Sequence, residues 1–225
     1  MRRLRGLALC LVTVLGLAAT PAVARVDQEK TVNNAAATVE RLKTDQNFQT
    51  SFRDDLQKSR AVLIVPDLYK GGFILGGQYG NGVLLPHLPD GTWGSPAFYT
   101  MEGGSLGLQI GLESSSILFI INTEKALHAI LANQFKFGGD AGITFLVVGA
   151  GIGASTTSNM GADVLAISLS AVGLYGGLSL EGTSLSPRES WNAAYYGQNV
   201  SSRAIVLDNA VSNPQANRLK EILAR

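Results

Sequence analysis

The sequence predicts an α+β protein with a single β-rich domain, built on a curved, mainly antiparallel, glycine-rich sheet of about eight strands. Amphipathic helical patterns occupy both ends of the chain, and short apolar runs of strand length fill the middle. Most of the 26 glycines accompany these strand-like runs. Because short turns join the strands, antiparallel pairing is favoured, with helices at the N- and C-terminal ends and one more in mid-chain.

Residues 1–24 have the pattern of a cleaved secretion signal. Three arginines precede an apolar run over residues 7–19, and Ala22-Val23-Ala24 has the small residues that signal peptidase requires. The run is shorter than the ~20 residues of a membrane span. Cys10 faintly resembles a lipoprotein acceptor, but the bulky Leu9 before it disfavours lipidation. We therefore expect a periplasmic or secreted protein that is cleaved after Ala24.

The mature chain would carry little net charge and no thiol. Three of the 18 basic residues lie in the signal, which leaves 15 against 17 acidic residues, and Cys10 is the sole cysteine. Stability must then come from a packed core rather than from disulfides. A weakly negative chain is not attracted to an acidic polymer, so nucleic acid is not expected as a partner.

Residues 25–60 form an N-terminal helical segment ahead of a domain over residues 61–225. Its apolar residues recur at spacings of three and four, which predicts two short amphipathic helices that cover the core. These residues are Val32, Ala35, Ala36, Val39 and Leu42, then Phe48, Phe52 and Leu56. The alternative is a helix on a membrane surface that uses Arg41, Lys43, Arg53 and Lys58, although neighbouring acidic residues weaken it.

The first strands are predicted from residue 61 onward. An apolar run over residues 61–65 ends at Pro66, and residues 71–85 contain six glycines among apolar residues. Such a density of glycine implies sheet curvature, bulges, or the close approach of another backbone or a ligand. Asp90-Gly91 marks a tight turn.

The segment Gly103–Asn122 is central to the predicted sheet. Leu106, Leu108, Ile110 and Leu112 alternate with small or polar residues, and the apolar run 117–121 follows three serines. This pattern predicts a hairpin whose second strand is buried on both faces. The bare face at Gly107 and Gly111 would serve either for packing or as a ligand wall.

The remaining elements follow from caps and apolar runs. Asn122 and Thr123 offer an N-cap for a helix that ends near Ala132, and strands are expected over 143–148, 164–169 and 174–180. Ser186-Pro187-Arg188-Glu189 has the form of a capping box before a helix that ends near Tyr196. Asn213-Pro214 is expected to cap a last helix.

Catalytic and metal motifs are weak. Gly103-Gly104-Ser105-Leu106-Gly107 fits the nucleophile elbow of a serine hydrolase, but the elbow needs a helix after the serine, where this chain has strand-like alternation. Residues 149–154 fit a dinucleotide fingerprint without a helix start after it. His87 and His128 belong to no spaced ligand set. We expect no enzyme activity, cofactor or metal, with a hydrolase using Ser105 as a remote alternative.

Six ordered blocks resemble the SYLF-domain family over roughly residues 30–225. The first covers residues 59–66, and the next comprises residues 70–77 with 80–84. The most characteristic block comprises residues 93–98 with 103–111, and the later blocks are residues 137–141, 173–182 and 195–197. This chain departs from the family pattern at residues 148–153 and 168–173, where two basic positions are absent.

The resemblance implies a lipid-binding module whose eukaryotic relatives bind phosphoinositides, here in an exported bacterial protein. The missing basic positions weaken the case for a phosphoinositide headgroup. The expected partner is a phospholipid or membrane surface, contacted by Lys58, Arg60 and Lys70 and by a wall at Gly107, Gln109 and Gly111. The alternative is an envelope structural or protein-interaction module that binds no lipid.

Overall fold

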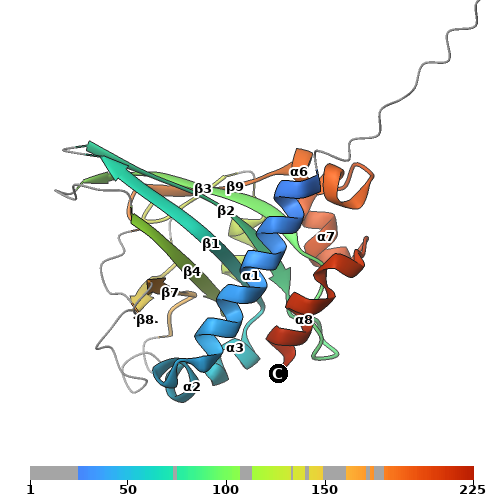
Figure 1. The fold of residues 1–225 in the computed structure, drawn as a ribbon, viewed down its shortest axis with the longest axis horizontal. Coiled ribbons are helices and arrows are strands. Elements are labelled where there is room, and N and C mark those ends of the chain that lie inside the picture. Colours follow the sequence, from blue (N-terminus) through green and yellow to red (C-terminus); the bar gives the residue numbers. More distant parts are fainter. Residues whose placement is uncertain are drawn as a thin grey trace, which may run out of the picture.

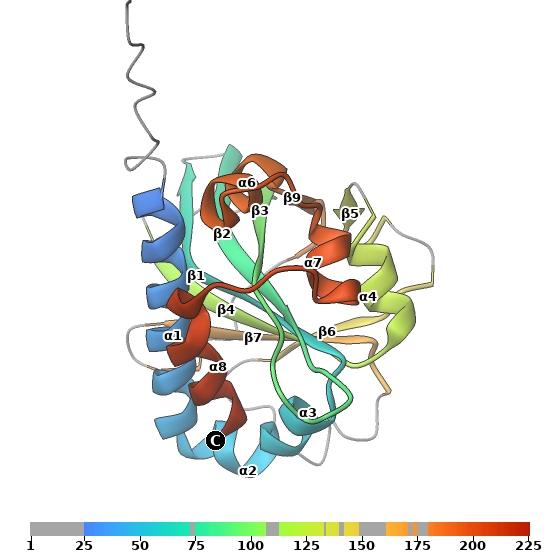
Figure 2. The same ribbon diagram turned by 90° about the vertical axis from the view of Figure 1, so that its right-hand side faces the viewer.

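The computed structural model describes residues 25–72, 75–106, 113–132, 134–139, 142–148, 161–170, 173–174 and 180–225. These residues form one curled, mainly antiparallel sheet with helices on both of its faces (Figures 1 and 2). The prediction of an α+β fold with a curved sheet, helices at the two ends and a helix in mid-chain is confirmed.

In the described part of the chain, three helices precede the sheet: α1 (Val26–Thr44), α2 (Gln46–Ser51) and α3 (Arg53–Lys58). Two were predicted, and the second is divided at Phe52 into α2 and α3. The predicted apolar stripes are fully buried, from Val32 through Leu42 on α1 to Phe48, Phe52 and Leu56 in the two short helices. Asp45 is the N-cap of α2, because its carboxylate accepts hydrogen bonds from the backbone N–H groups of Asn47 and Phe48. The stripes therefore cover the core, as predicted, and are not exposed for a membrane surface.

The sheet has the strand order β5-β9-β3-β2-β1-β4-β7-β6, and β8 pairs with β7. Its long central strands are β1 (Ala61–Gly72), β2 (Leu75–Pro86), β3 (Ala97–Leu106) and β4 (Glu113–Ile121). The shorter strands are β5 (Phe135–Lys136), β6 (Phe145–Val148), β7 (Val164–Ser170), β8 (Gly173–Leu174) and β9 (Thr183–Pro187). Among the described pairs, β6 with β7 is parallel and the others are antiparallel.

The predicted hairpin within Gly103–Asn122 is wrong. β3 pairs with β2 and β9, whereas β4 pairs with β1 and β7, so the β1–β2 hairpin separates the two strands. Alternation shows that a strand forms, but it does not specify a partner. The burial of β4 on both faces is confirmed, because residues 117–121 are all inaccessible to solvent.

Strand β1 does not stop at Pro66 as predicted. Val83 and Asn81 of β2 lie opposite Ile64 and Asp67, so β1 carries one extra residue there. This β-bulge accommodates a proline that has no N–H to donate to the ladder. The Ser116 hydroxyl of β4 donates a hydrogen bond to the Pro66 carbonyl at 2.6 Å, so this carbonyl has a partner although the strand pairing is interrupted there.

The bulge changes which side chains face α1. Before it, Val62 and Ile64 pack in the core beneath α1, while Leu63 and Val65 pack on the opposite face of the sheet. After it, Leu68 belongs to the opposite core, so the odd-numbered residues face α1.

Among the described residues, the other helices are α4 (Glu124–Ile130), α6 (Glu189–Tyr196), α7 (Ser202–Asp208) and α8 (Asn217–Ala224), and the 3₁₀ turn η2 (Pro214–Ala216) precedes α8. Of the two residues offered as the cap of α4, Thr123 takes that role, whereas the Asn122 side chain donates to the Ala162 carbonyl. The predicted cap Asn213 is confirmed, since it accepts a hydrogen bond from the Gln215 N–H. Helix α8 lies beside α1 in both views (Figures 1 and 2).

The predicted capping box at Ser186 is wrong. Ser186 and Pro187 are paired with Thr100 and Tyr99 as the end of β9, and α6 begins only at Glu189. The predicted end of this helix is confirmed, because Gly197 follows Tyr196 with φ of 72°, a left-handed conformation that favours glycine. Helix α7 and strands β5 and β9 were not predicted.

Candidate functional site

Two of the predicted basic residues line one pocket at the start of β1. This pocket, which we call the Arg60 pocket, has a volume of about 430 Å³. Its wall combines polar groups from the α3–β1 junction and from α4 with apolar side chains of the 86–91 turn, α4 and α7. The lining residues are Gln57, Lys58, Ser59, Arg60, Pro86, His87, Leu88, Pro89, Gly91, Glu124, Leu127, Val206 and Leu207.

Backbone hydrogen bonds hold Arg60 in place from two sides. Its N–H donates to the Ile121 carbonyl at 2.7 Å, and its carbonyl accepts from the His87 N–H at 2.9 Å. The preceding Ser59 ends α3, and its hydroxyl donates to the Leu56 carbonyl at 2.8 Å. The chain therefore passes from helix to strand at a fixed point, and Lys58 and Arg60 come to lie on the same pocket.

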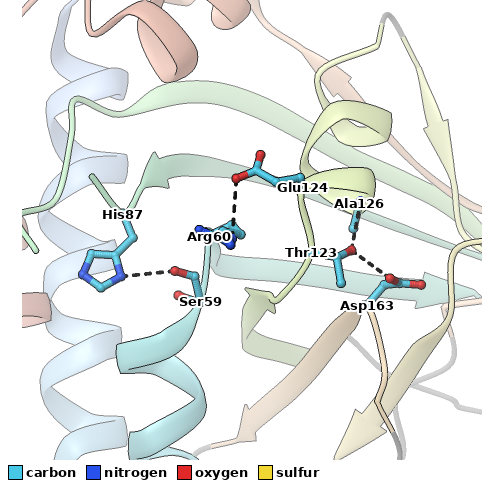
Figure 3. A network of polar contacts seen from close by, with 7 residues as sticks. All are labelled: Ser59, Arg60, His87, Thr123, Glu124, Ala126 and Asp163. Carbon is cyan, nitrogen blue, oxygen red and sulfur yellow. Dashed lines mark hydrogen bonds and ion pairs between the residues drawn. The ribbon is translucent and has the colours of Figure 1, made fainter. Parts of the chain in front are cut away.

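His87 forms a rigid part of the wall. Its ring stacks on Trp93, with 4.5 Å between centroids and an angle of 8° between planes. Its Nδ1 lies 3.1 Å from the Ser59 carbonyl oxygen (Figure 3). Because a carbonyl oxygen can only accept, Nδ1 carries the proton in this contact and donates it.

The pocket has a net positive charge, and its charged side chains are exposed to solvent. Arg60 Nε lies 3.5 Å from Glu124 Oε1, with more than half of each side chain exposed (Figure 3). Such a surface ion pair contributes little to stability, so Arg60 can exchange this partner for a ligand anion. Together with Lys58, the pocket has two cations against one carboxylate, beside the apolar side chains of Leu88 and Leu127.

A second polar network holds α4 against the pocket. The Thr123 hydroxyl accepts from the Ala126 N–H at 3.2 Å and donates to Asp163 Oδ1 at 2.7 Å (Figure 3). Asp163 Oδ2 accepts from both the N–H and the hydroxyl of Thr144 at 2.9 Å. Asp163 thus links the N-terminus of α4 to the segment that enters β6, and α4 carries Glu124 and Leu127.

Replacing Asp163 with asparagine is expected to lower the free energy of unfolding at pH 7 by about 1 kcal/mol, because the carboxylate accepts three hydrogen bonds at a solvent-accessible position. The hydrogen bonds from Thr144 and Thr123 lower the pKa of Asp163. Because the pKa is lower in the folded state, the carboxylate stabilises the fold at pH values above its pKa in the unfolded chain. This contribution to stability is lost as the pH falls through the pKa of the folded state. Urea unfolding of both proteins should therefore show a difference at pH 7 that shrinks by pH 3.

The matched control is Asp208→Asn, at an exposed position at the end of α7. It should lack the loss that Asp163→Asn shows at pH 7. A difference for Asp163→Asn that stays constant from pH 7 to pH 3 would contradict the assigned role of the carboxylate charge.

The other predicted site residues are not brought to the Arg60 pocket. Lys70 is half-buried near the far end of β1, ten residues from Arg60 and about 30 Å away along an extended strand. Gly107, Gln109 and Gly111 lie outside the described residues. Ser105 lies within β3 opposite Gly76, and pairing continues through Leu106 to Leu75, so the sharp turn of a nucleophile elbow is absent at Ser105 itself.

The sequence did not identify the apolar wall or the roles of His87 and Glu124. Leu207 comes from α7, which the sequence analysis missed although Ser201 before Ser202–Asp208 is a typical N-cap. His87 and Glu124 are distant in sequence from Arg60, and no sequence motif predicts that the three residues lie close together.

Within the described residues, no three His, Cys, Asp or Glu side chains are grouped so that they could hold a metal ion. No helix in that part of the chain combines the length and the apolar character that a membrane span requires.

Comparison with known proteins places this fold in a family. Residues 102–225 match the family model Ysc84, described as "Las17-binding protein actin regulator". Protein YSC84 of Saccharomyces cerevisiae is 31% identical over 171 residues, which cover 75% of this chain and 36% of the yeast protein. LAS seventeen-binding protein 3 of the same yeast is 30% identical over 173 residues, with coverage of 76% and 37%.

An animal relative gives the same result. The human SH3 domain-containing YSC84-like protein 1 is 29% identical over 169 residues, which cover 75% of this chain and 49% of the human protein. The chain thus spans less than half of the length of each of these relatives. The family model covers more than half of this chain, and the yeast matches extend over three quarters of it. The chain belongs to the Ysc84, or SYLF-domain, family.

Proposed function

We propose that this chain is a non-enzymatic phospholipid-binding module of the bacterial cell envelope. The observation that carries the proposal is the Arg60 pocket, where Lys58 and Arg60 adjoin an apolar wall. A phospholipid joins an anionic phosphate to apolar acyl chains, and the two cations and the apolar wall match these two parts. Membership of the SYLF family supports the same function, because the resemblance implies lipid binding. The secretion signal expected over residues 1–24 supports the envelope as the location.

The Arg60 pocket suits binding at a membrane surface. Arg60 presents a planar guanidinium to phosphate oxygens, whereas Lys58 supplies an exposed point charge. The proposed binding is an equilibrium in which lipid phosphate replaces Glu124 as the partner of Arg60. No bond is made or broken in it.

Replacing Lys58 and Arg60 together with alanine is expected to weaken binding to anionic vesicles about tenfold to thirtyfold at low salt, since each basic residue near such a surface contributes about 1 kcal/mol. The measurement is co-sedimentation of the mature protein with vesicles of phosphatidylglycerol and phosphatidylethanolamine. Raising the salt concentration should weaken wild-type binding, because the attraction is screened.

The matched control is the double variant Lys30→Ala with Arg203→Ala, which removes the same charge at exposed positions outside the pocket. It should retain most of the binding. The proposal fails if the wild-type protein does not bind anionic vesicles at low salt. It also fails if the control pair loses as much affinity as the Lys58 and Arg60 pair.

A protein-interaction module is the second candidate. It is favoured by the name of one relative, LAS seventeen-binding protein 3, which describes a protein that binds another protein. In vivo crosslinking that repeatedly captures one defined envelope protein, combined with an absence of vesicle binding, would select this candidate over the first.

A further inference from the structure

A second hollow lies on the α1 face of the sheet, past the bulge in β1. We call it the Tyr69 groove. It has a volume of about 350 Å³ and is lined from four directions, by α1, β1, β2 and the start of α6. The residues on which its chemistry depends are Asn34, Asp67, Tyr69, Tyr79, Asn81 and Arg188. Lys58 and Arg60 do not line it, so it is a separate site from the Arg60 pocket.

Two exposed tyrosines form one wall of the groove. Tyr69 of β1 and Tyr79 of β2 are directly opposite each other in the ladder and are 54% and 46% exposed. Among the described residues, the only other large hydrophobic side chain with such exposure is Val26. Such a cross-strand pair stabilises the sheet, and its exposed ring faces also give a ligand an apolar surface on which to stack.

Hydrogen bonds fix the orientation of the Asn81 amide. Its Oδ1 accepts from Arg188 Nη1 at 2.8 Å, from the Thr100 hydroxyl at 3.1 Å and from the Tyr79 hydroxyl at 3.2 Å. Because the Arg188 guanidinium can only donate, the amide atom that it contacts must be the oxygen, and Nδ2 remains a donor. The Arg188 guanidinium is itself held 3.7 Å from the centre of the Trp191 ring.

Acceptors face these donors across the groove. Asn34 Nδ2 of α1 donates to Asp67 Oδ2 at 2.8 Å, which orients both side chains. The Asn34 carbonyl oxygen and the second carboxylate oxygen of Asp67 then remain as acceptors. The groove therefore presents fixed donors and fixed acceptors beside two aromatic faces.

The charges of the lining determine the class of ligand. Asp27 and Asp67 balance Lys30 and Arg188, so neither an anion nor a cation is preferred. Hydroxyl groups both donate and accept, which matches a mixed set of amides and carboxylates better than a phosphate does, since a phosphate needs donors alone. Rings with apolar C–H faces and several hydroxyls are neutral sugars.

We propose that the Tyr69 groove binds a neutral sugar ring, stacked on Tyr69 and Tyr79 and hydrogen-bonded by Asn34, Asp67 and Asn81. The sugar comes either from a soluble glycan or from the headgroup of an uncharged glycolipid. The site does not depend on the Arg60 pocket and holds whether or not that pocket binds phospholipid.

The test is saturation-transfer NMR with cellobiose and N,N′-diacetylchitobiose at millimolar concentration. The wild-type protein should transfer saturation to at least one disaccharide. Replacing Tyr69 and Tyr79 together with alanine should reduce the signal at least fivefold, whereas Tyr69→Phe with Tyr79→Phe should keep most of it, because the ring faces remain. The alanine variant loses a cross-strand pair and should unfold at a somewhat lower temperature. Measuring the thermal midpoint of unfolding, and running the assay well below it, separates lost binding from lost folding.

Vesicles that carry a neutral glycosyl diacylglycerol distinguish the source of the sugar. Binding to these vesicles that depends on the tyrosines assigns the sugar to a lipid headgroup, and disaccharide binding without vesicle binding assigns it to a soluble glycan. The Lys58→Ala, Arg60→Ala protein should behave as wild type in the disaccharide assay, because neither residue lines the Tyr69 groove. The proposal is overturned if the wild-type protein binds neither the disaccharides nor the glycolipid vesicles, or if the Tyr69→Ala, Tyr79→Ala protein binds them as well as wild type does. It is also overturned if glucose 6-phosphate binds in the groove more tightly than cellobiose.

Discussion

Replacing Asn192 with alanine is expected to lower the free energy of unfolding by about 3 kcal/mol, because buried polar groups would lose their partners. Asn192 of α6 is completely buried. Its Oδ1 accepts from the Phe98 N–H at 2.9 Å, and its Nδ2 donates to Glu189 Oε2 at 3.0 Å and to the Ser202 hydroxyl at 2.9 Å. One amide thus connects β3, α6 and the first turn of α7.

The bond to Phe98 has the largest effect. Strand β9 ends at Pro187, opposite Tyr99, and the Arg188 N–H donates to the Phe98 carbonyl at 2.8 Å. The Asn192 side chain therefore continues the ladder by one acceptor beyond the end of the strand. Without it, the Phe98 N–H is buried and unpaired, which costs more than the net gain from an ordinary hydrogen bond.

Urea unfolding followed by circular dichroism measures this loss. Asn192→Leu should be about as destabilised as Asn192→Ala, because it restores volume but no acceptor. Asn199→Ala, at an exposed position, should stay within about 0.5 kcal/mol of wild type. If Asn192→Leu were as stable as wild type, the hydrogen bonds of the amide would contribute nothing and the assigned role would be wrong.

Local patterns predicted most of the helices and the buried strand β4. The apolar residues around Val39 and Phe52 recur every three or four positions, which predicts helices. The run 117–121 is entirely apolar, which predicts a strand buried in the interior of the sheet. The pairing of the strands was not predictable in the same way. Nothing in the alternation after Gly103 shows that β1 and β2 insert between β3 and β4, because the partner of a strand is a long-range choice.

The candidate sites were predictable only in part, for a related reason. Lys58 and Arg60 are two residues apart, so the sequence could place them together, whereas His87 and Glu124 reach them only through tertiary contacts. The Tyr69 groove could not have been predicted from strict alternation. Counted from Val62 and Ile64, Asp67 and Tyr69 would lie on the face away from α1, and the extra residue at Pro66 returns them to it.

The same bulge explains why glycine is required opposite it. Replacing Gly82 with alanine is expected to lower the free energy of unfolding by about 3 kcal/mol, because the interior there has no room for a methyl group. A Cβ atom at Gly82 would lie 2.5 Å from the Ile64 carbonyl oxygen and 2.9 Å from Val65 Cγ2. Gly82 is buried, and its neighbours Asn81 and Val83 pair across the bulge, so the backbones of β1 and β2 would have to separate.

Gly104→Ala is the matched control, because a Cβ at Gly104 in the adjacent strand β3 would have no atom within 4 Å. That change should leave stability within about 0.5 kcal/mol or raise it slightly, since alanine restricts the unfolded chain. The two variants, compared by urea unfolding, separate a general effect of glycine in strands from close approach at the bulge. A Gly82→Ala protein that is too unstable to purify, beside a normal Gly104→Ala protein, agrees with the prediction. Equal stability of the two would show that β1 can shift at Pro66, and the glycine would then not be required by backbone contact.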